Sequence, residues 1–250
     1  INPTLTTSIC LDGRVVSMTW DDTVKDAIVG TDVGSIWCLR RSANKVSAVP
    51  MARSHSAPVK ALAASENGVL LASAGGDDGS VRVWQTQLMQ DVLVLPHDSE
   101  EGSCNAVSMS VVSSEGGTRL LAAGYTDGTI RQYDLSNIFL PDGDSSIEKN
   151  KKNSKAHRAF ADILISKRRQ PHRSAVTALE YVTAFKRFNH TNGQSKSIKN
   201  VLISGSSNGD VVLNINHGTV VRELSTSHRG SRITCIERSP FDPALFLIAS

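Results

Sequence analysis

The chain has 250 residues, of which 40% are apolar and 20% are charged, and its formal net charge is +3. This is an ordinary globular composition, long enough to bury a sizeable core. The charge is too small to indicate nucleic-acid binding by itself, and no apolar run approaches the ~18–20 residues that span a bilayer.

The cysteines are few and widely separated, with no CxxC pair among them: Cys10, Cys38, Cys104 and Cys235. This spacing fits buried thiols in a reducing compartment better than a disulfide framework or a zinc site. No secretory signal opens the sequence. We therefore expect a cytoplasmic protein with no metal, no cofactor, and neither a membrane nor a nucleic acid as partner.

A short motif recurs four times along the chain. Each copy is an apolar strand, a turn with Asp or Asn near a Gly, and an alternating strand: AIVGTDVGSIWCL (27–39), LLASAGGDDGSVRVW (70–84), LLAAGYTDGTIRQYD (120–134) and VLISGSSNGDVVLN (201–214). The turn glycines are Gly34, Gly79, Gly128 and Gly209, at spacings of 45, 49 and 81 residues. A period of about 40–45 residues with four strands per unit is typical of a β-propeller blade. The third spacing is longer because polar segments are inserted there.

Each unit is expected to add an inner strand before the hairpin and an outer strand after it. The predicted inner strands span residues 15–20, 59–63, 106–112, 176–181 and 233–237. The predicted outer strands span 46–51, 91–95 and 219–224, whereas the segment after 134 departs from the pattern. The fifth unit begins near His228 and reaches only LFLIAS (245–250). We predict an all-β fold of about four and a half antiparallel four-stranded blades, belonging to a larger propeller.

The second unit resembles the WD40 family closely. In that family a His before the inner strand, a Ser or Thr in the next strand, an Asp in the turn and a Trp at the end of the following strand form a hydrogen-bonded tetrad. The matching residues are His55, Ser73, Asp78 and Trp84. The carboxylate and the hydroxyl would satisfy both nitrogens of the buried imidazole. The resemblance therefore implies a structural tetrad in a WD40 propeller that covers residues 1–250.

The other units depart from this tetrad. The residues at the same positions are Val29, Val33 and Leu39 in the first unit, Ala123, Asp127 and Tyr133 in the third, and His172, Ser204, Asn208 and Asn214 in the fourth. We predict that only the second blade carries the whole network.

The polar residues could also be interpreted as a nucleophilic site, a calcium loop or a phosphate loop, but the sequence supports each of these less well than a structural role. A His–Ser–Asp set can activate a nucleophile, but no nucleophile-elbow sequence is present. The Asp77-Asp78-Gly79 turn lacks the further oxygen ligands of a calcium loop, and residues 74–79 lack the Gly-Lys-Ser/Thr ending of a phosphate loop. The remaining histidines share no spacing that would make a metal site: His97, His157, His190 and His217. We predict that the chain is not an enzyme.

Two polar insertions, at about 142–170 and 185–200, interrupt the repeats. The first holds eight cations against one Glu and one Asp between residues 148 and 169: Lys149, Lys151, Lys152, Lys155, Arg158, Lys167, Arg168 and Arg169. The rest of the chain is therefore slightly acidic. Such runs are usually solvated loops; the alternative is a basic arm that contacts an acidic partner.

The order of the segments carries a narrower resemblance. Residues 11–37, 120–136 and 202–234 are similar to the C-terminal propeller region of the centriolar and ciliary WD-repeat proteins, of the proteome-of-centriole-sixteen and WD-repeat-ninety type. This resemblance implies a non-enzymatic scaffold of the centriole, basal body or cilium. Its candidate partners are tubulin of the microtubule wall and other centriolar scaffold proteins. The alternative is a WD40 adaptor that reads a peptide in ubiquitin ligation or trafficking.

Overall fold

The structure, a computed structural model, describes most of the chain. The described residues are 8–21, 25–42, 45–53, 55–65, 67–76, 78–86, 90–95, 102–111, 119–136, 164–168, 171–182, 185–188, 195–198, 201–215, 220–224, 230–239 and 245–250. Among them, no helix is long and apolar enough to cross a membrane. The chain divides into two compact units, residues 1–104 and 105–250, and each is described by itself.

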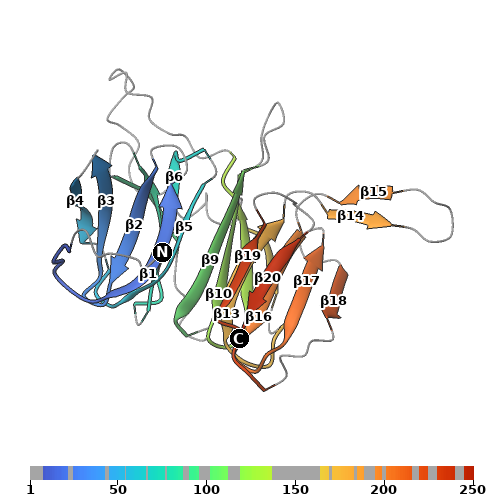
Figure 1. Cartoon of the computed structure of the whole chain (residues 1–250). Helices are drawn as coiled ribbons and strands as arrows, with labels where there is room; N and C mark the ends of the chain where they lie inside the picture. The colour runs from blue at the N-terminus through green and yellow to red at the C-terminus, as the bar shows by residue number, and fades with distance from the viewer. Residues whose placement is uncertain are drawn as a thin grey trace, which may run out of the picture. The chain divides into compact units, whose positions relative to one another are not determined.

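The first unit contains two four-stranded antiparallel sheets, which we call blades 1 and 2 (Figure 1). Blade 1 consists of β1 (Val15–Asp21), β2 (Asp26–Thr31), β3 (Ser35–Ser42) and β4 (Lys45–Arg53). Blade 2 consists of β5 (Val59–Ala64), β6 (Leu70–Gly75), β7 (Val81–Gln85) and β8 (Gln90–Leu95). The strands follow one another in chain order. The middle strand β6 is buried along its whole length, which is why its sequence is a continuous run of apolar and small residues rather than an alternating one.

The described part of the second unit contains two further blades and two two-stranded sheets. Blade 3 consists of β9 (Cys104–Val111), β10 (Arg119–Tyr125), β11 (Ile130–Asp134) and β12 (Leu164–Arg168). Blade 4 consists of β13 (Val176–Val182), β16 (Val201–Ser206), β17 (Val211–Ile215) and β18 (Val220–Leu224). The sheet of β19 (Cys235–Arg238) and β20 (Phe246–Ala249) begins a fifth blade. The prediction of an all-β fold built from antiparallel four-stranded blades is confirmed.

Two features of the second unit differ from the simplest reading of its polar insertions. The end of the first insertion is a strand, since β12 pairs with β11 and places Lys167 opposite Arg131. Blade 3 therefore has an outer strand, which the sequence pattern did not reveal. In the second insertion, β14 (Phe185–Phe188) pairs with β15 (Ser195–Ile198) as a separate hairpin between β13 and β16. His228, the predicted start of the fifth unit, lies outside the described residues.

The turn glycine of each of the four repeated hairpins has a left-handed backbone. Its φ angle is 88° at Gly34, 61° at Gly79, 88° at Gly128 and 89° at Gly209. Residues with a Cβ are disfavoured in this region. The recurrence of glycine in the sequence therefore follows from the conformation of the turn, and it explains why the hairpins could be located without a structure.

A glycine within the second strand of a blade, separate from the turn glycine, allows neighbouring blades to approach closely. Three glycines on second strands lie against the inner-strand region of the next blade within the same unit. A Cβ on these glycines would lie 2.7, 2.4 and 2.5 Å from the nearest carbon of the facing side chain. The respective pairs are Gly30 with Val59, Gly124 with Val176, and Gly205 with Ile233. Apolar clusters surround these contacts, so the core of each unit lies between its blades.

Candidate functional site

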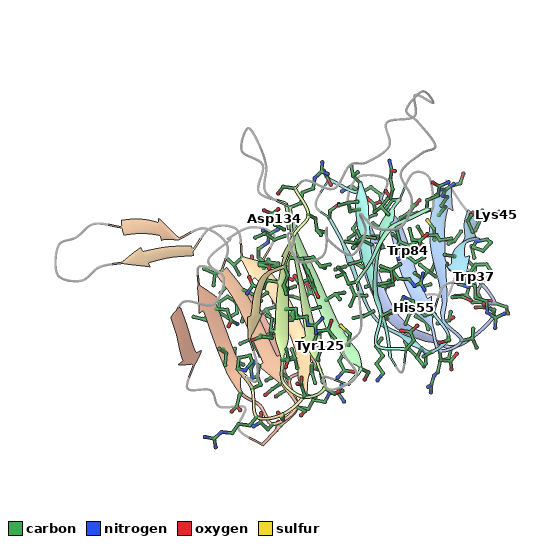
Figure 2. The ribbon with its side chains drawn as sticks, turned by 180° about the vertical axis from the view of Figure 1, so that it is seen from behind. Trp37, Lys45, His55, Trp84, Tyr125 and Asp134 are labelled. Carbon is green, nitrogen blue, oxygen red and sulfur yellow. The ribbon has the colours of Figure 1, made fainter. Side chains whose placement is uncertain are left out.

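The four tetrad residues come together in blade 2, although they come from different segments of the chain. His55 precedes β5, Ser73 lies within β6, Asp78 lies in the turn after β6, and Trp84 lies in β7. The imidazole contacts Asp78 Oδ2 through Nδ1 at 3.0 Å and Ser73 Oγ through Nε2 at 2.8 Å. The indole Nε1 of Trp84 donates to the same Ser73 oxygen at 2.8 Å. Figure 2 labels His55 and Trp84 in this blade.

The chemistry of the donors fixes where the protons lie. An ionised carboxylate only accepts, so the neutral imidazole carries its proton on Nδ1 and donates it to Asp78. His55 Nε2 then accepts the proton of Ser73, whose oxygen in turn accepts from the Trp84 indole. Every polar atom of the set is thereby satisfied with a neutral imidazole, as burial requires.

The surroundings hold the network in this protonation state. Burial lowers the pKa of His55, and the neighbouring Asp78 carboxylate offsets only part of that effect. Burial alone would raise the pKa of Asp78, but the backbone N–H of Ser80 and the His55 ring donate to the carboxylate, and the net shift is downward.

The arrangement links strands and does not present a nucleophile. Ser73 is fully buried, and both His55 and Trp84 occupy its hydroxyl. A substrate would have to displace the indole and open the sheet to reach it. The geometry therefore favours the structural role of the tetrad over the hydrolase alternative.

Blade 4 contains a partial version of this network. His172 Nε2 lies 2.8 Å from Ser204 Oγ, and the Asn214 amide donates to the same oxygen at 3.2 Å, in the place of the tryptophan. Ser204 Oγ also lies 3.3 Å from the carbonyl oxygen of Val212. Asn208 stands where blade 2 has Asp78, and the buried Nδ1 of His172 has no hydrogen-bond partner.

The burial of His172 predicts that the folded protein loses stability in mild acid. Burial lowers the pKa of His172 from 6.5 to about 4, so the folded state keeps it neutral while the unfolded chain takes up a proton below about pH 6.5. Stability is therefore full above pH 6.5 and falls as the pH decreases toward 4, by up to about 3 kcal/mol at a ratio of ~1.4 kcal/mol per pKa unit. Burial shifts the pKa of His55 in the same direction. Urea unfolding at pH 7 and pH 5 should show the loss, and a His172→Gln variant should lose less between these two pH values. An equal loss in both proteins would contradict this account.

Blade 1 has a polar cluster that sequence reasoning missed. Ser35 Oγ donates to Asp12 Oδ2 at 2.5 Å, and Trp37 Nε1 donates to Asp12 Oδ1 at 2.9 Å. The Ser35 hydrogen bond, more than any other cause, holds the pKa of Asp12 below its ordinary value. The cluster escaped detection because Trp37 lies two positions before the tetrad tryptophan in the hairpin register, where Val29 faces it across the sheet.

The predicted basic residues are only partly described. Lys167 and Arg168 lie in β12, and the other six lie outside the described residues: Lys149, Lys151, Lys152, Lys155, Arg158 and Arg169. In the described part of the chain, no group of three or more His, Cys, Asp or Glu side chains could hold a metal ion.

Comparison with known proteins points to one repeat family. The model of the WD domain, G-beta repeat, matches residues 48–85, which include the complete tetrad. WD repeat-containing protein 90 of Xenopus tropicalis is 30% identical over 248 residues, which is 96% of this chain. The chain spans 11% of the length of that relative.

Solved structures share the fold at low identity. A chain in the crystal structure of the mitotic checkpoint complex matches with a TM-score of 0.62 and 14% identity, over 99% of this chain and 65% of that chain. Chaetomium thermophilum Sqt1, solved bound to the N-terminus of the ribosomal protein L10, matches with a TM-score of 0.55 and 18% identity. This match covers 88% of the present chain and 50% of Sqt1.

Proposed function

Because this chain is a run of WD40 propeller blades, a class of protein-interaction module, we propose that it is a non-catalytic scaffold of a centriolar or ciliary microtubule-associated assembly. The observation that carries the proposal is the similarity to WD repeat-containing protein 90 along 96% of the chain. The segment order that resembles the centriolar and ciliary WD-repeat proteins supports it. Rigid blades with variable loops suit docking of protein partners better than chemistry.

The alternative function is that of an adaptor that binds a peptide in another pathway. Sqt1, whose structure includes the N-terminus of a ribosomal protein, is similar to this chain in fold. At 18% identity this likeness in fold is no evidence that the present chain binds the same kind of ligand. The scaffold therefore remains the main proposal.

The basic segment offers a way for the scaffold to contact an acidic partner. Residues 148–169 hold a surplus of six positive charges on a chain whose total is +3. Tubulin is the acidic partner that the centriolar proposal supplies. Attraction of this kind acts over about a Debye length, ~8 Å at physiological salt, and weakens as salt rises.

Co-sedimentation with microtubules tests this contact. We expect replacement of Lys149, Lys151, Lys152, Lys155 and Arg158 by Gln to weaken binding by about tenfold, because each exposed ion pair contributes ~0–1 kcal/mol and only several together matter. Lys167 and Arg168 are left intact because they lie in β12.

A matched control removes the same charge elsewhere. It replaces five exposed cations of the described blades and loops by Gln: Arg41, Lys45, Arg53, Arg173 and Arg232. The control should bind within about twofold of the wild type. Equal weakening by both variants would mean that only net charge acts, and unchanged binding by the first variant would mean that the segment is a solvated loop.

A further inference from the structure

The turn of blade 4 contains an Asn-Gly pair where blade 2 has an Asp-Gly pair. Asp78 and Asn208 each precede the left-handed turn glycine. Each accepts the backbone N–H of the residue two positions on, at 2.9 Å in blade 2 and 3.4 Å in blade 4. An Asn-Gly pair is the sequence in which asparagine loses its amide most readily, because glycine has no side chain to hinder the next backbone nitrogen. The chemistry of the pair therefore connects the amide of blade 4 to the carboxylate of blade 2.

The histidine of blade 4 lacks the partner that a carboxylate provides in blade 2. There, the Asp78 carboxylate contacts His55 Nδ1 at 3.0 Å. In blade 4, the buried His172 contacts Ser204 through Nε2 at 2.8 Å. Its Nδ1 has no hydrogen-bond partner among the described residues. A buried nitrogen without a partner destabilises the fold, and a carboxylate beside it would remove that cost.

The side chain of Asn208 lies against the loop that carries this histidine. Ser174, two residues after His172, donates through Oγ to Asn208 Oδ1 at 2.9 Å. The equivalent contact in blade 2 joins the backbone N–H of Ser56, which follows the tetrad histidine, to the Asp78 carboxylate at 3.3 Å. The same loop therefore positions the turn side chain in both blades.

Three donors surround the side-chain oxygen of Asn208. The hydroxyls of Ser174 and Ser206 contact Oδ1, and the backbone N–H of Asp210 lies 3.4 Å from it. Attack on Cγ would place negative charge on this oxygen, and donors that are already in place stabilise such charge. The attacking atom is the Gly209 nitrogen, whose N–H makes a long hydrogen bond of 3.3 Å to the Ser206 carbonyl. Asn208 is also exposed, so water can reach the product.

A second Asn-Gly pair in the described part of the chain provides the comparison. Asn67 is likewise exposed, and its Oδ1 accepts from Ser65 Oγ at 2.8 Å and from the Val69 N–H at 3.3 Å. The Gly68 N–H is bonded to the Ser65 carbonyl at 2.8 Å, a shorter bond than the one in the blade 4 turn. The Asn67 oxygen therefore has fewer donors, and the nitrogen that would attack its Cγ is held more tightly.

We propose that Asn208 is a site of spontaneous deamidation, and that the aspartate it yields completes the tetrad of blade 4. The Gly209 nitrogen forms a bond to Asn208 Cγ, the Cγ–Nδ2 bond breaks, and the amide leaves as ammonia with the Gly209 proton. One water molecule then opens the cyclic imide that remains. Cleavage of its N–Cγ bond gives aspartate, and cleavage of the backbone C–N bond gives isoaspartate.

The two products have opposite consequences for the blade. The aspartate would accept the proton of His172 Nδ1, as Asp78 accepts that of His55. The isoaspartate lengthens the turn by one backbone carbon and would disrupt it. Either product adds one negative charge to the turn. The proposal does not depend on which partner the chain binds.

Peptide mapping of the folded full-length protein, held at neutral pH for days and digested in mild acid, tests the reaction. We expect Asn208 to convert at least fivefold faster than Asn67 in the same sample. Ser174→Ala, which removes one donor from the Asn208 oxygen, should slow that conversion at least threefold and leave Asn67 unchanged. An Asn208 rate no higher than that of Asn67, or a rate that Ser174→Ala leaves unchanged or raises, would overturn the proposal, because the hydrogen bonds would not promote the attack.

A substitution that installs the product tests its effect on the blade. Asn208→Asp should lower the unfolding constant at neutral pH at least fivefold, because a hydrogen bond to a carboxylate satisfies the buried imidazole. In a His172→Gln background the same substitution should change the constant less than twofold. Asn67→Asp, the matched control, adds the same charge to a turn whose described contacts include no histidine, and it should also have less than a twofold effect. A stabilisation that persists without His172, or none in the wild type, would contradict the assignment of this carboxylate to the tetrad.

Discussion

Replacement of Ser73 by alanine is expected to lower the free energy of unfolding by about 3 kcal/mol. The hydroxyl accepts the indole proton of Trp84 and donates to His55, and all three side chains are buried. Its loss leaves one donor and one acceptor without partners inside the sheet, each at a cost of about 1–3 kcal/mol. Urea unfolding monitored by circular dichroism measures the change.

Two further variants separate the network from a general effect of losing a hydroxyl. Ser80→Ala removes a hydroxyl that donates to Asp78 at the partly buried edge of the same network, and it should cost less than about 1 kcal/mol. In a Trp84→Phe background the indole donor is absent, so Ser73→Ala should cost at least about 1 kcal/mol less than in the wild type. Additive losses in this double-mutant cycle would show that the two side chains are not coupled.

The turn glycine of blade 1 is expected to be equally sensitive. Gly34→Ala should cost about 3 kcal/mol or more, because the new Cβ would lie 2.0 Å from the carbonyl oxygen of His55, in a backbone of φ 88°. The neighbouring atom is backbone and cannot move aside without shifting the loop that carries the tetrad histidine. The midpoint temperature of thermal unfolding, Tm, should therefore fall by roughly 6–12 °C, at ~2–4 °C per kcal/mol for a chain of this size.

Gly230 offers the matched control for this substitution. Its φ is 85°, but no atom lies within 4 Å of an added Cβ. Gly230→Ala therefore tests the left-handed backbone alone and should cost about 1–2 kcal/mol. If the two variants were equally stable, the contact with the His55 carbonyl would not explain why glycine occupies the turn.

The local parts of the fold could be predicted from the sequence, and the long-range parts could not. Each hairpin carries its own signals, a buried apolar run and a glycine turn, so the strands around Gly79 and Gly128 were located directly. Strand β12 carries no such signal. Its residues, LISKR, pair with β11 across a long insertion, and pairing of that kind depends on the rest of the sheet rather than on local propensity.

The same division holds for the polar networks. The tetrad of blade 2 follows a spacing that a motif captures, and the structure brings all four side chains together. In blade 4 the motif indicates His172 and Ser204, but it could not show that Asn214 takes over the bond made by the tryptophan. The Asp12 cluster of blade 1 uses residues outside the motif altogether, so only the structure could reveal it.

The most direct test of the proposed function is the location of the full-length protein, tagged at its own locus, in ciliated cells. Expansion microscopy against tubulin and a centriole marker would give its position along the microtubule wall. The scaffold proposal predicts a stable signal at the centriole wall or ciliary base that persists after the soluble pool is extracted. A signal confined to the diffuse cytoplasm or to vesicles, absent from centrioles, basal bodies and cilia, would contradict it and favour the adaptor alternative.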